Sequence, residues 1–155
     1  ANNKKELKKA IKIAKKYDNK IIVEKFINAQ ELEIAVIKNK KLIISEVGEI
    51  ISANNFYDYE AKYVTDTSTA YIPARISEQV EEQVREAAVK IYSAIGCQGL
   101  SRVDFFVTAD HRVVFNEINT LPGFTSISMY PTLFAASGIP YKEIIENLLQ
   151  LAQEA

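Results

Sequence analysis

Two short stretches of the sequence carry side chains that could bind a metal ion. Arg102 and Asp104 are one residue apart, and so are Glu117 and Asn119. Both pairs fall in predicted strands joined by a turn at residues 110 and 111, and residues two apart in a strand share one face. Antiparallel pairing about that turn sets Asp104 opposite Glu117. It also sets Arg102 opposite Asn119, so all four side chains are expected on one face of the hairpin.

This pairing has an electrostatic consequence. The opposed carboxylates of Asp104 and Glu117 repel each other unless positive charge lies between them, and a divalent cation is the simplest candidate. Oxygen ligands from Asp104, Glu117 and Asn119 suit Mg²⁺ or Mn²⁺, and bound Mg²⁺ commonly completes its shell with substrate phosphates. The pattern therefore indicates a nucleotide site. The alternative is a solvated face whose charges alternate by chance, since a one-residue slip in register removes the pairing.

Hydrophobic spacing predicts the elements that would position this hairpin. Helices are predicted over residues 4–17, 77–95 and 141–153. Ile- and Val-rich stretches predict strands over residues 21–27, 32–38, 41–47, 102–108 and 112–118, the first three as an antiparallel meander. The buried face of the hairpin is predicted to consist of Val103, Phe105, Val107, Val114 and Ile118. Residues 52–71 are predicted to be a loop long enough to indicate a function, and strands with helices outside them indicate an α+β fold.

The composition excludes several classes of protein. Of the 155 residues, 48% are hydrophobic and 25% are charged, and the formal net charge is -1. This balance is typical of a globular protein and lacks the basic excess of a nucleic-acid binder. No apolar run reaches the roughly 18 residues of a membrane-spanning helix, so we expect a cytoplasmic protein without nucleic acid or membrane as partner. Cys97 is expected to be a small buried residue, and His111 a solvated turn residue.

Four segments together resemble the D-alanine–D-alanine ligases, which belong to the ATP-grasp superfamily. These segments are residues 31–37, 56–63, 99–104 and 116–126, and they include a Tyr-Glu-Ala-Lys-Tyr run followed by Asn-Glu-Ile-Asn-Thr-Leu-Pro-Gly. Their order and spacing make the resemblance specific. It implies an ATP-grasp portion of mainly antiparallel sheets flanked by helices. Residues 1–53 would belong to the central subdomain, and residues 54–155 would form a mobile active-site loop and the C-terminal catalytic subdomain.

The resemblance also implies a binding site for ATP with two Mg²⁺ or Mn²⁺ ions. Asp104, Glu117 and Asn119 match the ligands of the ions that bridge the phosphates. The nucleoside is expected to contact another set, comprising Glu24, Lys25 and Ile27 at the adenine and Glu31 at the ribose. Glu33 is close enough in sequence to be confused with Glu31 in the ribose role.

Other residues match the catalytic and substrate-binding positions of the family. Lys62 and Tyr63 match the end of the loop that closes over the γ-phosphate. Arg102 matches the arginine that stabilises the oxyanion of the tetrahedral intermediate, together with the backbone N–H of Gly123. Two residues, Ser128 and Met129, match the stretch that receives the carboxylate of the second D-alanine.

The implied reaction joins two D-alanines at the expense of ATP through an acyl phosphate, for peptidoglycan precursor synthesis. The family's N-terminal domain and phosphate loop are absent from the sequence, so a missing N-terminal segment of the same enzyme is an expected partner. The full-length enzyme is expected to be a homodimer. The alternatives are another ATP-grasp carboxylate–amine ligase, a D-alanine–D-lactate ligase, or a non-catalytic nucleotide- or metal-binding fragment.

Overall fold

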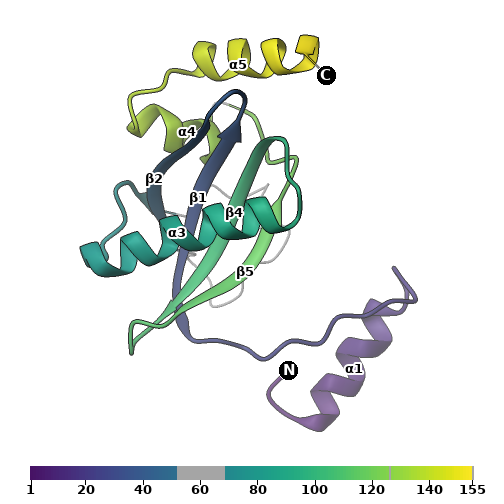
Figure 1. Ribbon diagram of the computed structural model, residues 1–155. Helices are drawn as coiled ribbons and strands as arrows, with labels where there is room; N and C mark the ends of the chain where they lie inside the picture. The colour runs from purple at the N-terminus through teal and green to yellow at the C-terminus, as the bar shows by residue number, and fades with distance from the viewer. Residues whose placement is uncertain (52–68, 126, 155) are drawn as a thin grey trace.

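A five-stranded antiparallel sheet lies at the centre of the described part of the chain (Figure 1). The computed structural model describes residues 1–51, 69–125 and 127–154. The strands have the spatial order β3-β2-β1-β4-β5. Their bounds are β1 Ala29–Lys38, β2 Leu42–Ile51, β3 Thr69–Tyr71, β4 Gly99–Thr108 and β5 Val113–Asn119. The helices in the described residues are α1 Lys4–Ala14, α3 Glu78–Ala94, α4 Met129–Ala136 and α5 Tyr141–Glu154.

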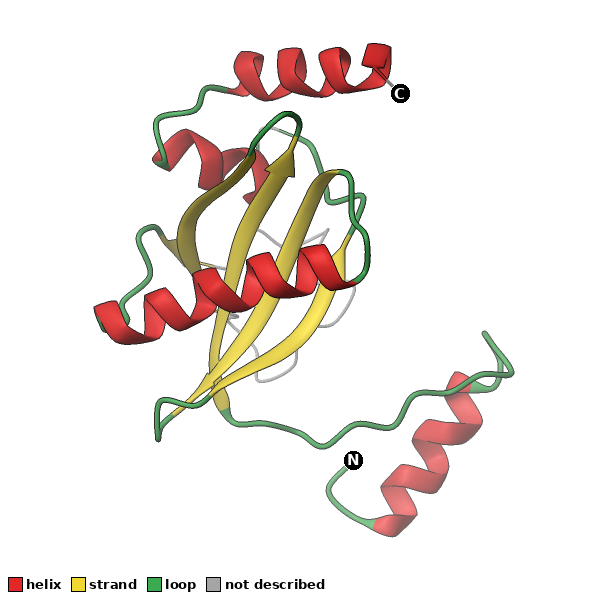
Figure 2. Cartoon of the chain, in the orientation of Figure 1, coloured by secondary structure: helices red, strands yellow, loops and turns green. Residues whose placement is uncertain are grey.

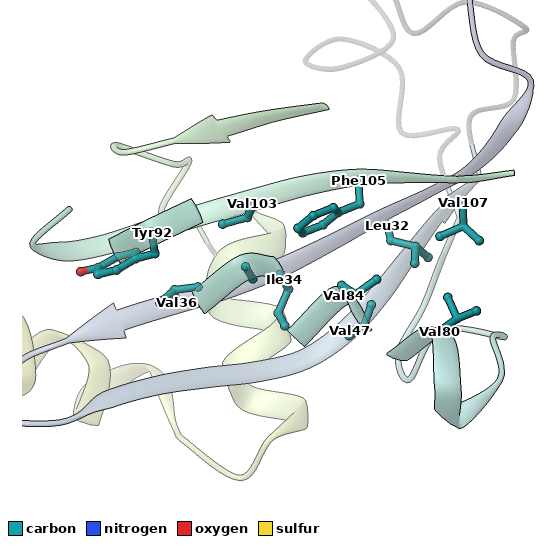
Figure 3. Close-up of a cluster of buried hydrophobic side chains, with 11 residues drawn as sticks. Leu32, Ile34, Val36, Val47, Val80, Val84, Tyr92, Val103, Phe105 and Val107 are labelled. Carbon is teal, nitrogen blue, oxygen red and sulfur yellow. The ribbon is translucent and has the colours of Figure 1, made fainter. Parts of the chain in front are cut away.

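Helix α3 crosses one face of the sheet and forms the larger hydrophobic core with it (Figures 1 and 3). Alternate residues of a strand point to opposite faces, so every second residue of β1 and β4 meets the helix. The buried members are Leu32, Ile34, Val36, Val47, Val80, Val84, Ala88, Tyr92, Val103, Phe105 and Val107. This core holds β1 and β4 side by side and leaves the intervening residues on the other face.

Helices α4 and α5 cover only part of that other face. Ala35 and Ile37 of β1 form a second core with both helices, through Tyr130, Leu133, Phe134 and Ile144. Helix α4 comes close to β2 because Gly48 has no side chain: a Cβ there would lie 2.7 Å from Cδ2 of Leu133 and 3.0 Å from Cε of Met129. The stretch of β1 that precedes Ala35 carries Glu31 and Glu33, and this end of the face is not part of either core.

Helix α1 and the segment after it lie apart from the sheet (Figure 2). Asn3 caps α1 as its side chain accepts hydrogen bonds from the N–H groups of Lys5 and Glu6, yet no residue of the helix is buried. The strand predicted over residues 21–27 is wrong, because these residues belong to no helix or strand. Their Ile and Val content is typical of a strand, but a strand also needs a neighbour for its backbone hydrogen bonds. Among the described strands, none pairs with them.

Most other predicted elements are confirmed. The helix predicted over residues 77–95 corresponds to α3, and the one predicted over residues 141–153 corresponds to α5. Two elements were not predicted: the short strand β3, which takes the last residues of the predicted 52–71 loop, and helix α4. Cys97 is half-buried against the larger core, and His111 is an exposed turn residue with a φ of 61°.

The sheet joins both parts of the chain that sequence analysis separates at residues 53 and 54. Strands β1 and β2 come from the first part, and β4, paired to β1 along its whole length, comes from the second. The division into subdomains stays a prediction. Within the described residues, the helices are all too short or too polar to span a membrane.

Candidate active site

Three neighbouring strands bring acidic and basic side chains together on the partly open face of the sheet. The pairing of β1 with β4 and of β4 with β5 sets these residues in two rows that run across the strands. The first row consists of Glu33, Asp104 and Glu117, and the second of Ala35, Arg102 and Asn119. The predicted opposition of Asp104 to Glu117, and of Arg102 to Asn119, is confirmed.

The register differs from the prediction nearer the turn. There Phe105 pairs with Phe115 and Val107 with Val113, so Asn116 is an extra residue on β5. The turn is longer than the predicted two residues, which shifts the pairing of the residues next to it. The extra residue Asn116 is a β-bulge that reverses this shift, so Glu117 is again opposite Asp104. Val114 is consequently turned away from the larger core, and the residue that packs against it is Val113.

Arg102 is the positively charged centre of this arrangement. Its Nε donates to Oδ1 of Asp104 at 2.8 Å, and its Nη2 donates to Oδ2 at 2.8 Å. The same Nε lies 3.2 Å from Oε2 of Glu33. Arg102, Asp104 and Glu33 are 7%, 8% and 8% exposed, so the guanidinium and both carboxylates are largely removed from water.

These contacts determine the charge state of Arg102. Burial by itself lowers the pKa of the guanidinium, but the hydrogen bonds to Asp104 and the charges of Glu33, Asp104 and Glu117 outweigh it and raise the pKa. Arg102 therefore carries its positive charge at neutral pH. Arg102 supplies positive charge beside Asp104 and Glu33 on this face, and the divalent cation expected between Asp104 and Glu117 stays a prediction.

A hollow of about 270 Å³ opens next to the first row of side chains. It is lined by Glu31, Leu32, Glu33, Asp104, Phe105, Phe106, Asn116 and Glu117. Glu117 is exposed, whereas Asn119 is partly buried. Asp104 and Glu117 line the hollow, and Asn119 lies two residues beyond Glu117 on the same strand. The carboxylate and amide oxygens of these three residues fit the preference of Mg²⁺ for oxygen ligands.

No cluster of three or more His, Cys, Asp or Glu side chains that could bind a metal by themselves is found in residues 1–51, 69–125 and 127–154. The predicted set contains only two carboxylates and an amide. A cation there would need ligands from a bound molecule as well, which is the usual situation for Mg²⁺ at a nucleotide.

The residues predicted to contact the nucleoside are only partly brought together. Glu31 lines the hollow and is more exposed than Glu33, which contacts Arg102. Glu24 and Lys25 are exposed in the segment after α1, and Ile27 is partly buried. None of these last three lines the hollow. Lys62 and Tyr63 lie outside the described residues.

A second set of predicted residues meets where the chain enters α4. Oγ of Ser128 accepts a hydrogen bond from the N–H of Thr125 at 3.0 Å and lies 2.8 Å from Oγ1 of Thr125. Gly123 is so close that a Cβ built on it would lie 2.9 Å from Oγ of Ser128. Met129 begins α4, and its side chain packs against the second core beside Gly48. Gly123 thus lies next to Ser128, and the side chain of Met129 packs against β2.

The sequence does not predict the position of Glu33 beside Arg102. The sequence indicates Glu33 only as an alternative ribose contact, whereas in the structure its carboxylate contacts Arg102. Its alternation with Glu31 indicated a shared face, but only the pairing of β1 with β4 shows that Glu33 lies opposite Asp104. That pairing joins segments far apart in the sequence, so no local pattern reveals it.

Comparisons with known proteins identify the family of this chain. Residues 1–150 match the family model described as the D-ala D-ala ligase C-terminus. A D-alanine–D-alanine ligase of Acetivibrio thermocellus is 54% identical over 153 residues, which are 98% of this chain and 41% of that protein. The chain therefore spans less than half the length of this relative.

Solved structures show the same fold. The VanG D-Ala:D-Ser ligase of Enterococcus faecalis is 44% identical with a TM-score of 0.84, over 96% of this chain and 43% of that one. A D-alanine–D-alanine ligase of Bacillus anthracis complexed with ATP is 27% identical with a TM-score of 0.82, over 99% of this chain and 49% of that one. The fold is thus that of an ATP-grasp ligase. By its family model and its relatives, this chain belongs to the family of D-alanine–D-alanine ligase C-terminal domains.

Proposed function

We propose that the protein containing this chain is an ATP-dependent ligase that forms D-alanyl-D-alanine for peptidoglycan precursors. The observation that carries the proposal is the opposition of Asp104 to Glu117 beside the buried, protonated Arg102, at the edge of a hollow. Membership of the family supports the same activity. We further propose a cytoplasmic homodimer in which residues 1–53 complete a central subdomain and residues 54–155 form the active-site loop and catalytic subdomain.

The reaction has two steps with balanced bonds. A carboxylate oxygen of the first D-alanine attacks the γ-phosphorus of ATP, and the bond to the leaving ADP breaks, which gives an acyl phosphate. The amine of the second D-alanine attacks the acyl carbon, loses a proton, and expels inorganic phosphate as the tetrahedral intermediate collapses. Because the chemistry belongs to the substrates, the protein's contribution is positioning and charge stabilisation.

Asp104, Glu117 and Asn119 would hold two Mg²⁺ or Mn²⁺ ions at the phosphates. Such ions neutralise the charge that develops on transferring phosphoryl oxygens. In the described structure these three residues occupy adjacent strands, so their relative positions are fixed by the sheet. Rigid placement of this kind removes the reorganisation that flexible ligands would need.

Arg102 would stabilise the oxyanion of the tetrahedral intermediate together with the backbone N–H of Gly123. A protonated guanidinium held by buried carboxylates is preorganised, and in a site with little water it stabilises developing negative charge strongly. Glu31 is favoured over Glu33 for the ribose, because Glu31 is the more exposed and Glu33 contacts Arg102. The adenine contacts would come from the segment with Glu24, Lys25 and Ile27.

The remaining residues would bind the substrates. Ser128 and Met129 would receive the carboxylate of the second D-alanine at the start of α4, where the positive end of a helix dipole favours an anion. Lys62 and Tyr63 would close over the γ-phosphate. The second candidate is a ligase that uses D-serine in place of the second D-alanine, because the VanG protein, 44% identical to this chain, is a D-Ala:D-Ser ligase.

Calorimetric titration of ATP into the full-length protein, with and without Mg²⁺, tests the nucleotide site. We expect tight binding only with Mg²⁺, and a loss of at least about tenfold in affinity for Glu117→Gln, which keeps the shape but removes the charge. A matched control is Glu82→Gln, an exposed position on α3 at the opposite face. Equal binding with and without Mg²⁺, or equal binding by Glu117→Gln and wild type, would contradict the proposal.

A further inference from the structure

Arg102 is shared between two carboxylates that lie on different strands. Asp104 on its own strand accepts from Nε and Nη2 with both oxygens, and Glu33 on β1 lies 3.2 Å from the same Nε. The two carboxylates are also directly opposite each other in the pairing of β1 with β4. All three side chains are largely buried, so water cannot easily replace the charged partner of any of them.

This arrangement creates a conflict at Asp104 if the proposed function is correct. Asp104 would then be a cation ligand, yet both of its oxygens accept hydrogen bonds from Arg102. The remaining lone pairs of these oxygens would bring a doubly charged ion close to the guanidinium, and the two positive charges would repel each other. Arg102 must therefore weaken its hold on Asp104 when the cation binds.

The row of carboxylates shows where Arg102 can go. Asp104 lies between Glu33 on β1 and Glu117 on β5. A guanidinium that moves toward Glu33 moves away from Glu117 and from the cation. Glu33 is already within ion-pair distance, so a small rotation of the Arg102 side chain would replace one buried carboxylate partner with another.

We propose that Glu33 is a positioning residue that holds the guanidinium of Arg102 on this face when a divalent cation takes Asp104. The inference rests on the proposed function and adds a residue to it. Glu33 in this role touches neither substrate nor cation. Its effect passes through Arg102: it makes cation binding compatible with an arginine that stays buried and aimed at the site.

Loss of the Glu33 charge should then have a consequence that depends on Arg102. In Glu33→Gln, Asp104 is the carboxylate that still contacts the guanidinium within the described residues. Arg102 should either remain on Asp104 and oppose the cation, or leave the site when the cation binds. Removing any negative charge near the site also weakens cation binding by simple electrostatics, so the two contributions must be separated.

A double-mutant cycle on Mn²⁺ affinity separates them. Mn²⁺ binding is measured by electron paramagnetic resonance in the full-length protein with a non-hydrolysable ATP analogue. We expect Glu33→Gln to lower the affinity about tenfold when Arg102 is present, and only about twofold to threefold when combined with Arg102→Met. An equal loss in both backgrounds would show that Glu33 acts only by its charge, and would overturn the proposal.

A second measurement needs no change at Arg102, whose replacement could prevent folding. In ¹⁵N-labelled protein, the Nε–H signal of Arg102 reports on its partner and on its exchange with water. With Mg²⁺ and the ATP analogue, we expect the wild-type signal to shift and remain sharp, and the Glu33→Gln signal to broaden through exchange. If Glu33 had a purely structural role, Glu33→Gln would expose the guanidinium of Arg102 to water even without Mg²⁺.

The two possible failures are distinguishable. If the wild-type protein binds Mg²⁺ and nucleotide but the Arg102 signal does not move, or stays equally sharp in Glu33→Gln, the role of Glu33 is overturned and the proposed function stands. If the wild-type protein binds neither Mg²⁺ nor nucleotide, both proposals are overturned together.

Discussion

The side chain of Ser128 occupies the space beside Gly123 that a Cβ atom would need. A Cβ built on Gly123 would lie 2.9 Å from Oγ of Ser128, closer than carbon and oxygen atoms pack without a bond between them. Ser128 cannot rotate away without cost, because its Oγ accepts from the N–H of Thr125. The two proposed substrate-site residues are therefore coupled through one small contact.

We expect Gly123→Ala to lower the free energy of unfolding by about 1–3 kcal/mol, as overpacking usually does. Ser128→Ala should cost about 1 kcal/mol through the lost hydrogen bond to Thr125. The double variant should cost less than the sum of the two, since removing Oγ frees the space that the new methyl needs. Urea denaturation of the three variants measures this, and strict additivity would show that the contact does not exist in solution.

Replacing Asp104 should destabilise the fold as well as the site. Asp104→Asn removes a buried charge that accepts two hydrogen bonds from Arg102, and breaking a buried pair costs about 3–5 kcal/mol when the partner is left alone. Glu33 still balances Arg102 in this variant, so we expect a smaller loss of about 1–3 kcal/mol. Thermal denaturation compares it with Glu117→Asn on the exposed neighbour, where we expect less than about 0.5 kcal/mol. An equally small loss at Asp104 would show that Arg102 does not depend on it.

Acid should weaken an ion pair on the α3 side of the sheet. The carboxylate of Glu49 accepts two hydrogen bonds from the Arg75 guanidinium, which lies 3.8 Å above the ring of Tyr71. The hydrogen bonds from Arg75 outweigh burial and lower the pKa of Glu49 below its ordinary value of 4.5. A lowered folded-state pKa means that the stabilisation is fully present above about pH 4.5 and is lost as the pH falls through the lower value.

Glu49→Gln measures this contribution. It should be less stable than wild type at pH 7, and the difference should shrink as the pH falls below 4.5, since the wild type then loses its charge as well. Denaturant unfolding at several pH values follows the difference. A gap that stays constant down to about pH 3 would show that the charge of Glu49 does not stabilise the fold.

The hydroxyl of Tyr130 helps to hold α4 against the sheet. It donates to the carbonyl oxygen of Val36 at 3.1 Å, and the side chain is fully buried. We expect Tyr130→Phe to cost about 1–2 kcal/mol, because a buried hydrogen bond is lost. Tyr141→Phe is the control: its hydroxyl donates to the carbonyl of Phe124, but the residue is exposed, and we expect less than about 0.5 kcal/mol. Equal losses in chemical denaturation would contradict the role assigned to Tyr130.

The hairpin of the site was predictable because its strands are neighbours in the sequence. One short turn limits the possible registers, so the opposition of Asp104 to Glu117 follows from the alternation of side chains. The turn itself is one residue longer than predicted. The bulge at Asn116 compensates for that difference, and nothing in the pattern of β5 marks it.

Other features depend on contacts that a local pattern does not contain. The pairing of β1 with β4, which brings Glu33 to Arg102, is a long-range choice made by the packing of α3 on both strands. Residues 21–27 have the composition of a strand but no strand beside them among the described residues. Helix α4 is short and carries Pro131 as its third residue, a position in the first turn where proline is tolerated, so the local sequence does not mark it as a helix.

The most direct test of the proposed function is the product that the full-length protein forms. Mass spectrometry would analyse products from ATP, Mg²⁺ and an equimolar mixture of D-alanine, D-serine and D-lactate at neutral pH. We predict D-alanyl-D-alanine as the dominant product, with inorganic phosphate and ADP formed in equal amounts. A dominant D-alanyl-D-serine or D-alanyl-D-lactate product, or hydrolysis of ATP without any coupled product, would contradict the proposal.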